Sequence, residues 1–325
     1  MKALVTGSSG FIGSTLVEKL TQTGHQVVCL IRRNSSREWL NHLPVTFCQA
    51  DLMSGEGIAQ ALAGVDWVFH LAGVTKAKKR QGYLDGNVIP TQQLLRACSS
   101  AADLKKFIHI SSQAAAGPSL PGIPLTEDDE PHPISIYGES KWLAEKEVMK
   151  YSGQLPVTIL RPPSVYGPKD RDILTYFRNV KKGFVLVLGK GTQQISIVHV
   201  TDLVQAMILA AENPASCGKV FFVAGDGHFD WQTIGSQIAQ ALEKKVVTIH
   251  VPVWMLSIVS QVSLLASRFS ARPALLNQDK VREMIQPSWL CSNERAKREL
   301  GFHPQVSLEQ GVAETAAWYR EKAWL

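Results

Sequence analysis

The sequence has few cysteines and no pattern that would pair them. Five cysteines occur among 325 residues, at positions 29, 48, 98, 217 and 291, and no two are spaced C-x-x-C. Their odd number argues against a disulfide framework, so we expect reduced thiols, mostly in the core, in a cytoplasmic protein. The nine histidines never pair at metal-ligand spacing on a helix, and we therefore expect no metal.

We also expect no secretion signal, because residues 1–20 already have the pattern of a strand followed by a helix. No known nucleic-acid-binding motif accompanies the formal net charge of +6, so we expect no nucleic-acid partner. We interpret the densest basic run, residues 76–80, as a solvated loop rather than an anion-binding edge at an active-site mouth.

One long segment has no charged residue at all. Residues 246–267 contain no Lys, Arg, Asp or Glu, and they approach the length of a membrane span. Pro252 splits the segment, and four serines and a glutamine follow it. We therefore favour a buried cap helix, which would suit a lipophilic substrate. A shallow contact with a membrane interface and a transmembrane helix are the weaker alternatives.

Three glycines mark a turn between the first predicted strand and the first predicted helix. Gly7, Gly10 and Gly13 lie between a strand at residues 2–6 and an apolar-periodic helix that begins at residue 11, and a second strand follows at residues 25–31. Gly7 permits the tight turn, Gly10 lets the backbone approach a pyrophosphate, and Gly13 lets the helix pack closely. The helix N-terminus favours phosphate, so this pattern predicts a dinucleotide site.

A tyrosine and a lysine, Tyr137 and Lys141, stand four residues apart on one face of a predicted helix. A phenol with a pKa of about 10 is a poor base at neutral pH. We expect the nearby ammonium and a positively charged nicotinamide ring to lower the pKa of Tyr137. The phenol could then exchange a proton with a carbonyl or alcohol oxygen, so the two motifs together predict a nicotinamide enzyme.

These motifs resemble those of the extended branch of the short-chain dehydrogenase/reductase superfamily, whose glycine pattern is T-G-x-x-G-x-x-G. Further segments carry the resemblance, in order, over nearly the whole chain: Asp51-Leu52, His70-Leu71-Ala72-Gly73, Asn87, Leu160–Pro168, Ile197–Leu203 and Leu300–Pro304. Residues 288–292 and 296–302 more weakly resemble the 3β-hydroxysteroid-dehydrogenase-like and dihydroflavonol-reductase-like members.

The resemblance implies an α/β fold, with a Rossmann-type doubly wound parallel sheet and a smaller C-terminal α+β substrate-binding cap. We expect residues 1–168 and 198–226 to form the NAD(P)-binding Rossmann domain, and residues 169–197 and 227–325 to form the cap. Within these parts we expect helices at 172–180 and 201–212, a strand at 195–198 and a main-sheet strand at 220–224. Relatives often dimerise through a helix bundle that would include the Tyr137 helix, so a homodimer is expected by analogy.

The resemblance also assigns four catalytic residues. Tyr137 would exchange the proton, and Ser112 would hydrogen-bond the substrate oxygen, with Ser111 as the fallback. Lys141 would hold the nicotinamide ribose, and Asn87 would position a water relay toward Lys141. The residues expected to bind the cofactor are Thr6, Gly7, Gly10, Phe11, Ile12, Gly13, Arg32, Arg33, Asp51, Leu52, Leu71, Ala72, Gly73, Tyr137, Lys141, Pro162, Ser164 and Val165.

The end of the second strand favours NADP(H) over NAD(H). An NAD site usually has an acidic residue there, bonded to the adenosine ribose. Ile31 stands in that place, and Arg32 and Arg33 follow it. A guanidinium can bind a phosphate through two hydrogen bonds, so this edge suits a 2′-phosphate.

We expect a small-molecule substrate, and the sequence argues against one class of reaction. Sugar-nucleotide dehydratases of this branch carry Asp-Glu after the active-site Thr, whereas Gln113 and Ala114 follow Ser112 here, so dehydration is not expected. The leading hypothesis is an NADP(H)-dependent ketone reductase or secondary-alcohol dehydrogenase acting on a lipophilic substrate. The alternatives are a nucleotide-sugar 4-epimerase with tightly bound NAD and a non-catalytic nucleotide-binding subunit.

Overall fold

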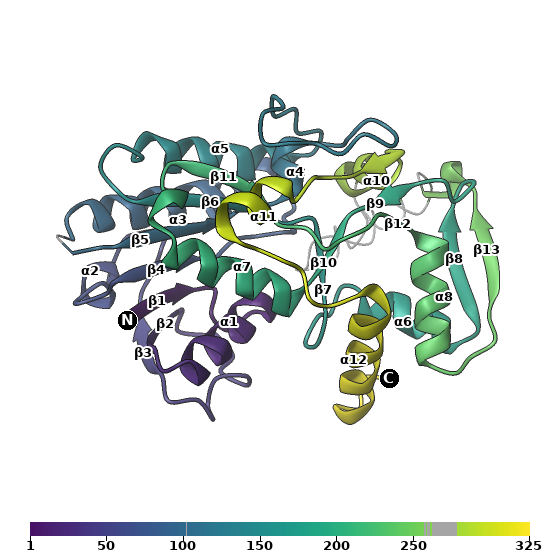
Figure 1. Ribbon diagram of the computed structural model, residues 1–325, viewed down its shortest axis with the longest axis horizontal. Coiled ribbons are helices and arrows are strands. Elements are labelled where there is room, and N and C mark those ends of the chain that lie inside the picture. The colour runs from purple at the N-terminus through teal and green to yellow at the C-terminus, as the bar shows by residue number, and fades with distance from the viewer. Residues whose placement is uncertain (102, 257, 259–260, 262–277) are drawn as a thin grey trace.

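A seven-stranded parallel sheet forms the larger part of the molecule (Figure 1). The computed structural model describes residues 1–101, 103–256, 258, 261 and 278–325. The sheet has the order β11-β6-β5-β4-β1-β2-β3. Its strands are β1 (Lys2–Thr6), β2 (Gln26–Ile31), β3 (Thr46–Gln49), β4 (Trp67–His70), β5 (Lys106–Ile110), β6 (Val157–Arg161) and β11 (Lys219–Phe222). The doubly wound α/β fold is thus confirmed, including a main-sheet strand near residue 220.

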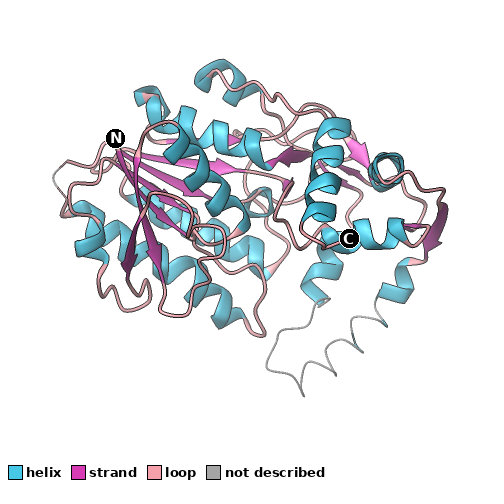
Figure 2. Ribbon diagram, turned by 90° about the horizontal axis from the view of Figure 1, so that it is seen from below, coloured by secondary structure: helices cyan, strands magenta, loops and turns pink. Residues whose placement is uncertain are grey.

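Helices cover both faces of this sheet (Figures 1 and 2). The helices α1 (Phe11–Gln22), α7 (Val200–Glu212) and α11 (Glu294–Leu300) share one hydrophobic core with it. On the other face, α2 (Ile58–Ala61), α3 (Arg80–Ser99) and α5 (Ile136–Lys150) share a second core. The central strands are buried on both faces, which explains why they read as nearly continuous apolar runs.

The smaller part is built from short mixed sheets and helices around a third core (Figure 1). Its strand pairs are β7 (Ser164–Tyr166) with β10 (Ile197–His199), and β8 (Phe184–Leu188) with β13 (Val247–Val251). A third sheet joins β9 (Gln194–Ile195), β12 (Phe229–Asp230) and β14 (Ser288–Trp289). The helices are α6 (Leu174–Lys181), α8 (Trp231–Ala241), α10 (Gln278–Met284) and α12 (Leu308–Glu321). The exact domain boundaries remain a prediction.

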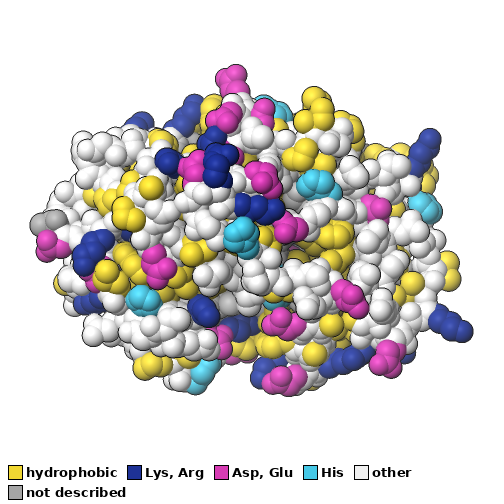
Figure 3. Space-filling view, viewed as in Figure 1, with side chains coloured by type: hydrophobic (Ala, Val, Ile, Leu, Met, Phe, Trp, Pro, Cys, Tyr) yellow, Lys and Arg dark blue, Asp and Glu magenta, His cyan; other side chains and the backbone are white. Residues whose placement is uncertain are grey.

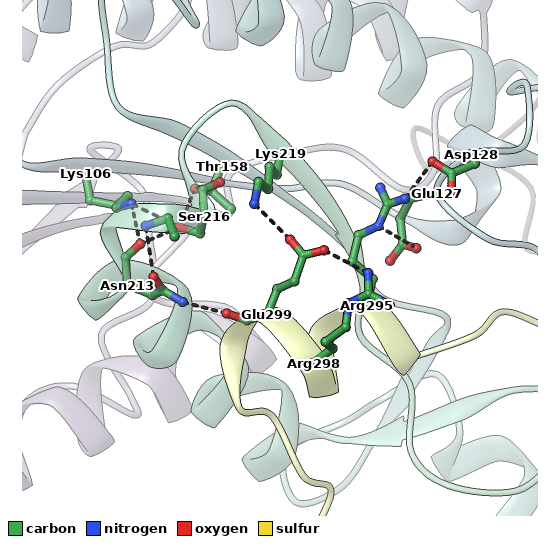
Figure 4. A network of polar contacts seen from close by, with 11 residues as sticks. Lys106, Glu127, Asp128, Thr158, Asn213, Ser216, Lys219, Arg295, Arg298 and Glu299 are labelled. Carbon is green, nitrogen blue, oxygen red and sulfur yellow. Dashed lines mark hydrogen bonds and ion pairs between the residues drawn. The ribbon is translucent and has the colours of Figure 1, made fainter.

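A polar network ties the helix α11 to the edge strand β11. Charged side chains gather over these elements on the face seen in Figure 3, and Figure 4 shows their contacts. Glu299 of α11 forms an ion pair with Lys219 at 2.9 Å. The carboxylate of Glu127 accepts a hydrogen bond from the backbone N–H of Phe222 at 2.7 Å. An edge strand with unpaired N–H groups can recruit other strands, so this carboxylate and helix protect the sheet edge.

The prediction of one strand at residues 195–198 was wrong. The chain changes sheets at Ser196, so β9 and β10 belong to different sheets. The backbone N–H of Ser196 donates to the carbonyl of Trp289 at 2.8 Å, and its hydroxyl accepts from the N–H of Cys291 at 3.1 Å. A short apolar run indicates that its residues are buried, but it does not indicate which strands they pair with.

The prediction of a buried cap helix across residues 246–267 was also wrong in its first part. Residues 247–251 form the strand β13, and Val247 is 65% exposed. The short helical turn at 253–256 after Pro252 carries exposed apolar side chains. Residues 257, 259–260 and 262–277 lie outside the described part. Among the described helices, none combines the length and the apolar character that a membrane crossing requires.

Candidate functional site

The candidate site lies at the carboxyl edge of the parallel sheet. The strands β1, β4, β5 and β6 are parallel neighbours, so their carboxyl ends and the loops that follow meet at one edge. The glycine turn follows β1, the 71–73 loop follows β4, and Ser112 follows β5. Parallel pairing therefore gathers groups that are more than one hundred residues apart in the sequence.

The glycine turn has the geometry that a dinucleotide phosphate site needs. Gly7 has a φ of +68°, and a Cβ there would lie 2.8 Å from the backbone nitrogen of Ala72. A Cβ on Gly13 would lie 2.1 Å from the carbonyl oxygen of Gly7. Helix α1 begins after Gly10, and no side chain of the described residues caps its N-terminus. The free N–H groups and the helix dipole suit a pyrophosphate, so the residues present fit the predicted cofactor.

A chain of buried hydrogen bonds joins the end of β1 to the 71–73 loop and to helix α3. The backbone N–H of Ala72 donates to the hydroxyl of Thr6 at 3.1 Å, and this hydroxyl lies 2.8 Å from Nδ1 of His70. The Nε2 of His70 lies 2.9 Å from the hydroxyl of Thr91, which donates to the carbonyl of Asn87 at 2.7 Å. Thr91 must then accept from Nε2, so Nδ1 accepts from Thr6. Thr6 is thus engaged within the protein, and it holds the 71–73 loop against β1.

Two arginines lie free at the end of β2. Arg32 and Arg33 are exposed, and neither forms an ion pair with a described residue. With Asn34 they border a surface cavity of about 360 Å³. The hydroxyl of Ser35 accepts a hydrogen bond from the backbone N–H of Arg32 at 3.0 Å and closes the turn that presents these side chains.

The other predicted cofactor residues lie around the same edge. Asp51 is exposed after β3, and Leu52 beside it is half-buried. The carbonyl of buried Pro162 accepts from the N–H of Gln113 at 2.8 Å, which joins the loop after β6 to the short helix α4 (Gln113–Ala116). The remaining predicted contacts are half-buried or exposed: Phe11, Ile12, Leu71, Ala72, Gly73, Ser164 and Val165.

Tyr137 and Ser112 come together, and in the protein without cofactor Lys141 is not among the groups that shift the pKa of the phenol. Burial raises the pKa of Tyr137 to about 12, and hydrogen bonding with the Ser112 side chain acts in the opposite sense. The ammonium of Lys141 donates instead to the carbonyl of Ile110 at 2.6 Å. In the protein alone, the loss of hydration outweighs the hydrogen bond with Ser112, and the Lys141 ammonium is directed elsewhere.

A buried ion pair that no sequence motif indicated acts on the charge of Lys141 through its carboxylate. Burial lowers the pKa of Lys141 to about 8, and the carboxylate of Glu145, one helical turn on, raises it. Arg161 of β6 donates to Glu145 from Nε at 3.0 Å and from Nη2 at 2.7 Å, and both side chains are at most 5% exposed. The i, i+4 spacing from Lys141 was the available sequence signal for Glu145.

Asn87 lies within the site, but its side chain is occupied by the protein. Its Oδ1 accepts from the N–H of Val74 at 2.7 Å, and its Nδ2 donates to the Val74 carbonyl at 3.0 Å and to the Ser140 hydroxyl at 2.8 Å. Ser140 in turn donates to the carbonyl of Tyr137 at 2.7 Å. Asn87 therefore joins the loop after β4 to the helix α5, and the water relay remains a prediction.

Two carboxylates of α10 contact the start of the helix α5. The Ser135 hydroxyl, which caps α5, donates to Glu283 at 2.6 Å, and the N–H of Ile136 donates to Asp279 at 3.2 Å. Negative charge is favourable at a helix N-terminus, and Glu283 also contributes to the raised pKa of Tyr137. These carboxylates lie about 140 positions along the chain from α5, and no sequence pattern links them.

Three buried histidines on the sheet and its connections remain neutral. Burial lowers the pKa of His70 to about 3 and of His199 to about 4, and it holds that of His109 well below 6.5. In the described part of the chain, no group of three His, Cys, Asp or Glu side chains lies together as a metal site would require. The absence of a metal remains a prediction.

The sequence from residue 3 to residue 224 matches the NAD dependent epimerase/dehydratase family over more than half of the chain. The chain belongs to this family. It is thus an NAD(P)-dependent enzyme of the extended short-chain dehydrogenase/reductase type, as the resemblance predicted. A nucleotide cofactor and a small-molecule substrate follow from this membership.

Proteins similar to this chain are named for different compounds. The chain is 27% identical to a ceramide reductase of Caulobacter vibrioides, over 99% of this chain and 95% of that one. It is 27% identical to a 3-beta-hydroxysteroid dehydrogenase of Mycolicibacterium neoaurum, over 98% and 92%. The solved UDP-glucuronic acid 4-epimerase of Bacillus cereus with NAD is 25% identical, with 99% of both chains covered and a TM-score of 0.80. Family membership therefore leaves the substrate open.

Proposed function

We propose that the protein is an NADP(H)-dependent oxidoreductase that passes hydride between the nicotinamide and a ketone or secondary alcohol of a lipophilic substrate. The observation that carries this proposal is the convergence of Tyr137, Ser112 and Lys141 at the edge that also holds the glycine turn. The ceramide reductase and the hydroxysteroid dehydrogenase are named for lipids, which supports a lipophilic substrate.

The protein's own groups suit the reduction of a carbonyl. Because the pKa of Tyr137 is raised to about 12, the phenol is protonated at neutral pH and can donate its proton to the carbonyl oxygen. Ser112 would orient that oxygen by a hydrogen bond. The nicotinamide supplies the hydride. Lys141, buried beneath the site, would hold the ribose and supply positive charge as the phenolate forms.

The free guanidiniums support the choice of NADP(H). Arg32 and Arg33 border a cavity at the end of β2, where an acidic residue would otherwise select NAD. Arginines without an ion-pair partner among the described residues are available to a 2′-phosphate. A homodimer and a cytoplasmic location remain predictions.

A nucleotide-sugar 4-epimerase is the second candidate, and the likeness to the Bacillus cereus epimerase favours it. The two reactions differ in their use of hydride, because an epimerase returns the hydride to its substrate. A third reading, a non-catalytic subunit, is weakened by the presence of both Tyr137 and Lys141.

An NADPH-oxidation screen separates these candidates. The panel pairs lipid-like ketones with sugar nucleotides, and the purified protein is first assayed for bound NAD. Net NADPH oxidation with a lipid-like ketone is expected. Bound NAD, with interconversion of sugar nucleotides and no net NADPH loss, would establish the epimerase instead. NADPH binding without turnover on any member would favour the non-catalytic subunit.

A further inference from the structure

The two-stranded sheet of β8 and β13 presents an apolar face to solvent. Parallel pairing sets Val247 beside Phe184 and Ile249 beside Leu186, and these four side chains are 38–65% exposed. On the opposite face, Val185 and Val187 are buried in the cap core. A sheet that packs on one side usually carries polar residues on the other, so this outward face departs from the ordinary pattern.

Exposed apolar side chains also follow the end of β13. Val253 and Trp254 are 44% and 64% exposed, and a methyl group of Val253 lies 3.5 Å from the position of a Cβ on Gly189, just after β8. The docking face is defined as Phe184, Leu186, Val247, Ile249, Val253 and Trp254. It lies at the end of the molecule remote from the Rossmann sheet (Figure 1). An exposed patch of this kind marks an interaction surface.

A cationic cavity adjoins the end of this sheet where both strands begin. Its volume is about 260 Å³, and it is lined by Lys181, Lys244, Arg320 and two leucines. Neither lysine ammonium has a hydrogen-bond or ion-pair partner among the described residues, and Arg320 donates only to the Ala241 carbonyl at 3.2 Å. Hydrophobic and basic side chains lie next to one another along the right-hand edge of Figure 3, over β8 and β13.

We propose that the docking face binds the surface of a bilayer that contains anionic phospholipid. Residues 181–190 and 242–251 carry five lysines and one glutamate, so the charge around the face complements an anionic membrane. A lipid phosphate fits the cationic cavity, and the apolar side chains enter the interface, where tryptophan is favoured. A second copy of the chain fits less well, because its face carries the same positive charge.

The test measures how the full-length protein partitions onto vesicles. Vesicles of phosphatidylcholine with phosphatidylglycerol are compared with vesicles of phosphatidylcholine alone, at low and high salt. We expect binding to the anionic vesicles that is at least about tenfold stronger and weakens with salt. Equal partitioning onto both kinds of vesicle, or none onto either, would overturn the proposal.

Two sets of variants locate the surface. Lys181→Glu with Lys244→Glu reverses the cavity charge, and Val247→Ser with Ile249→Ser removes exposed apolar area. Each pair should lower partitioning roughly tenfold while leaving NADPH affinity and the melting temperature unchanged, because these side chains are exposed. The matched controls are Lys19→Glu and Ile123→Ser, which alter exposed residues elsewhere.

Equal losses from the controls would refute this location of the surface. A change of oligomeric state in the Val247 and Ile249 pair would assign the face to a second copy instead. Membrane binding should also shift the tryptophan emission to shorter wavelength, and Trp254→Phe should remove that shift. A shift that persists in this variant contradicts the insertion of the face. Vesicle partitioning does not depend on turnover, so a failure of this proposal can be told apart from a failure of the proposed reaction.

Discussion

Breaking the buried ion pair beneath Lys141 should destabilise the protein far more than removing the pair altogether. Glu145 and Arg161 are at most 5% exposed and share hydrogen bonds of 2.7–3.2 Å. Glu145→Gln leaves a buried guanidinium without its counter-charge, a loss of about 3–5 kcal/mol. A double variant in which Met replaces both side chains leaves no buried charge. It should lower the free energy of unfolding less than either single substitution does.

Thermal melting of the wild type, Glu145→Met, Arg161→Met and the double Met variant measures the effect. For a chain of this size, each single variant should melt roughly 5–10 °C lower than the wild type. Glu147→Gln is the control, because Glu147 is on the same helix but pairs with the exposed Lys150. This substitution should lower the free energy of unfolding by less than about 1 kcal/mol. Costs that simply add in the double variant would refute the argument that the two charges depend on each other.

The same substitution should alter the pH dependence of turnover. Burial lowers the pKa of Lys141 to about 8, and the Glu145 carboxylate raises it. Removing that carboxylate lowers this pKa further, so Lys141 loses its charge at a lower pH. The alkaline limb of the pH–rate profile should then move toward neutrality in Glu145→Gln. An unmoved limb would show that the ammonium does not set it.

Three further predictions concern the cofactor turn and the buried histidines. Arg32→Ala should weaken NADPH binding roughly 10- to 100-fold and leave NADH unchanged, whereas the exposed Arg96→Ala alters neither dissociation constant. Gly13→Ala should abolish dinucleotide binding in titrations, since its Cβ would lie 2.1 Å from a backbone oxygen, while Gly153→Ala has open space and should bind normally. The three buried histidines take up protons below pH 6.5 only when unfolded, so stability should fall with pH from 6.5 toward 4. At pH 5, His70 and His199 each lower the free energy of unfolding by about 2 kcal/mol, and His109 acts in the same direction. Asp170, whose pKa is raised to about 6, offsets about 1 kcal/mol of this loss. A melting temperature unchanged between pH 7 and pH 5 would contradict this.

Local patterns predicted the elements that carry the site. The strand at residues 2–6, the glycine turn and the helix from Phe11 form as expected, because apolar periodicity and a required positive φ at Gly7 are local properties. Tyr137 and Lys141 lie on α5 as their spacing predicted. Their meeting with Ser112 follows from the parallel order of the sheet, which the family resemblance supplied.

The features that could not be predicted depend on contacts between residues far apart in the sequence. Residues 247–251 are as apolar as a buried helix, yet they pair with β8, whose position along the chain no local signal gives. The pKa of Tyr137 depends on how much hydration folding removes, and spacing does not report this. Glu283 reaches α5 from a distant part of the chain, and only the folded structure shows that contact.

The most direct test of the account is the rate of NADPH oxidation by Tyr137→Phe with the ketone that the screen identifies. We expect turnover to fall about 10²- to 10⁴-fold with the NADPH dissociation constant unchanged, because only the proton donor is removed. Tyr151→Phe, at the far end of the same helix, should behave as wild type. Turnover near the wild-type rate in Tyr137→Phe would contradict the assignment of this phenol as the acid.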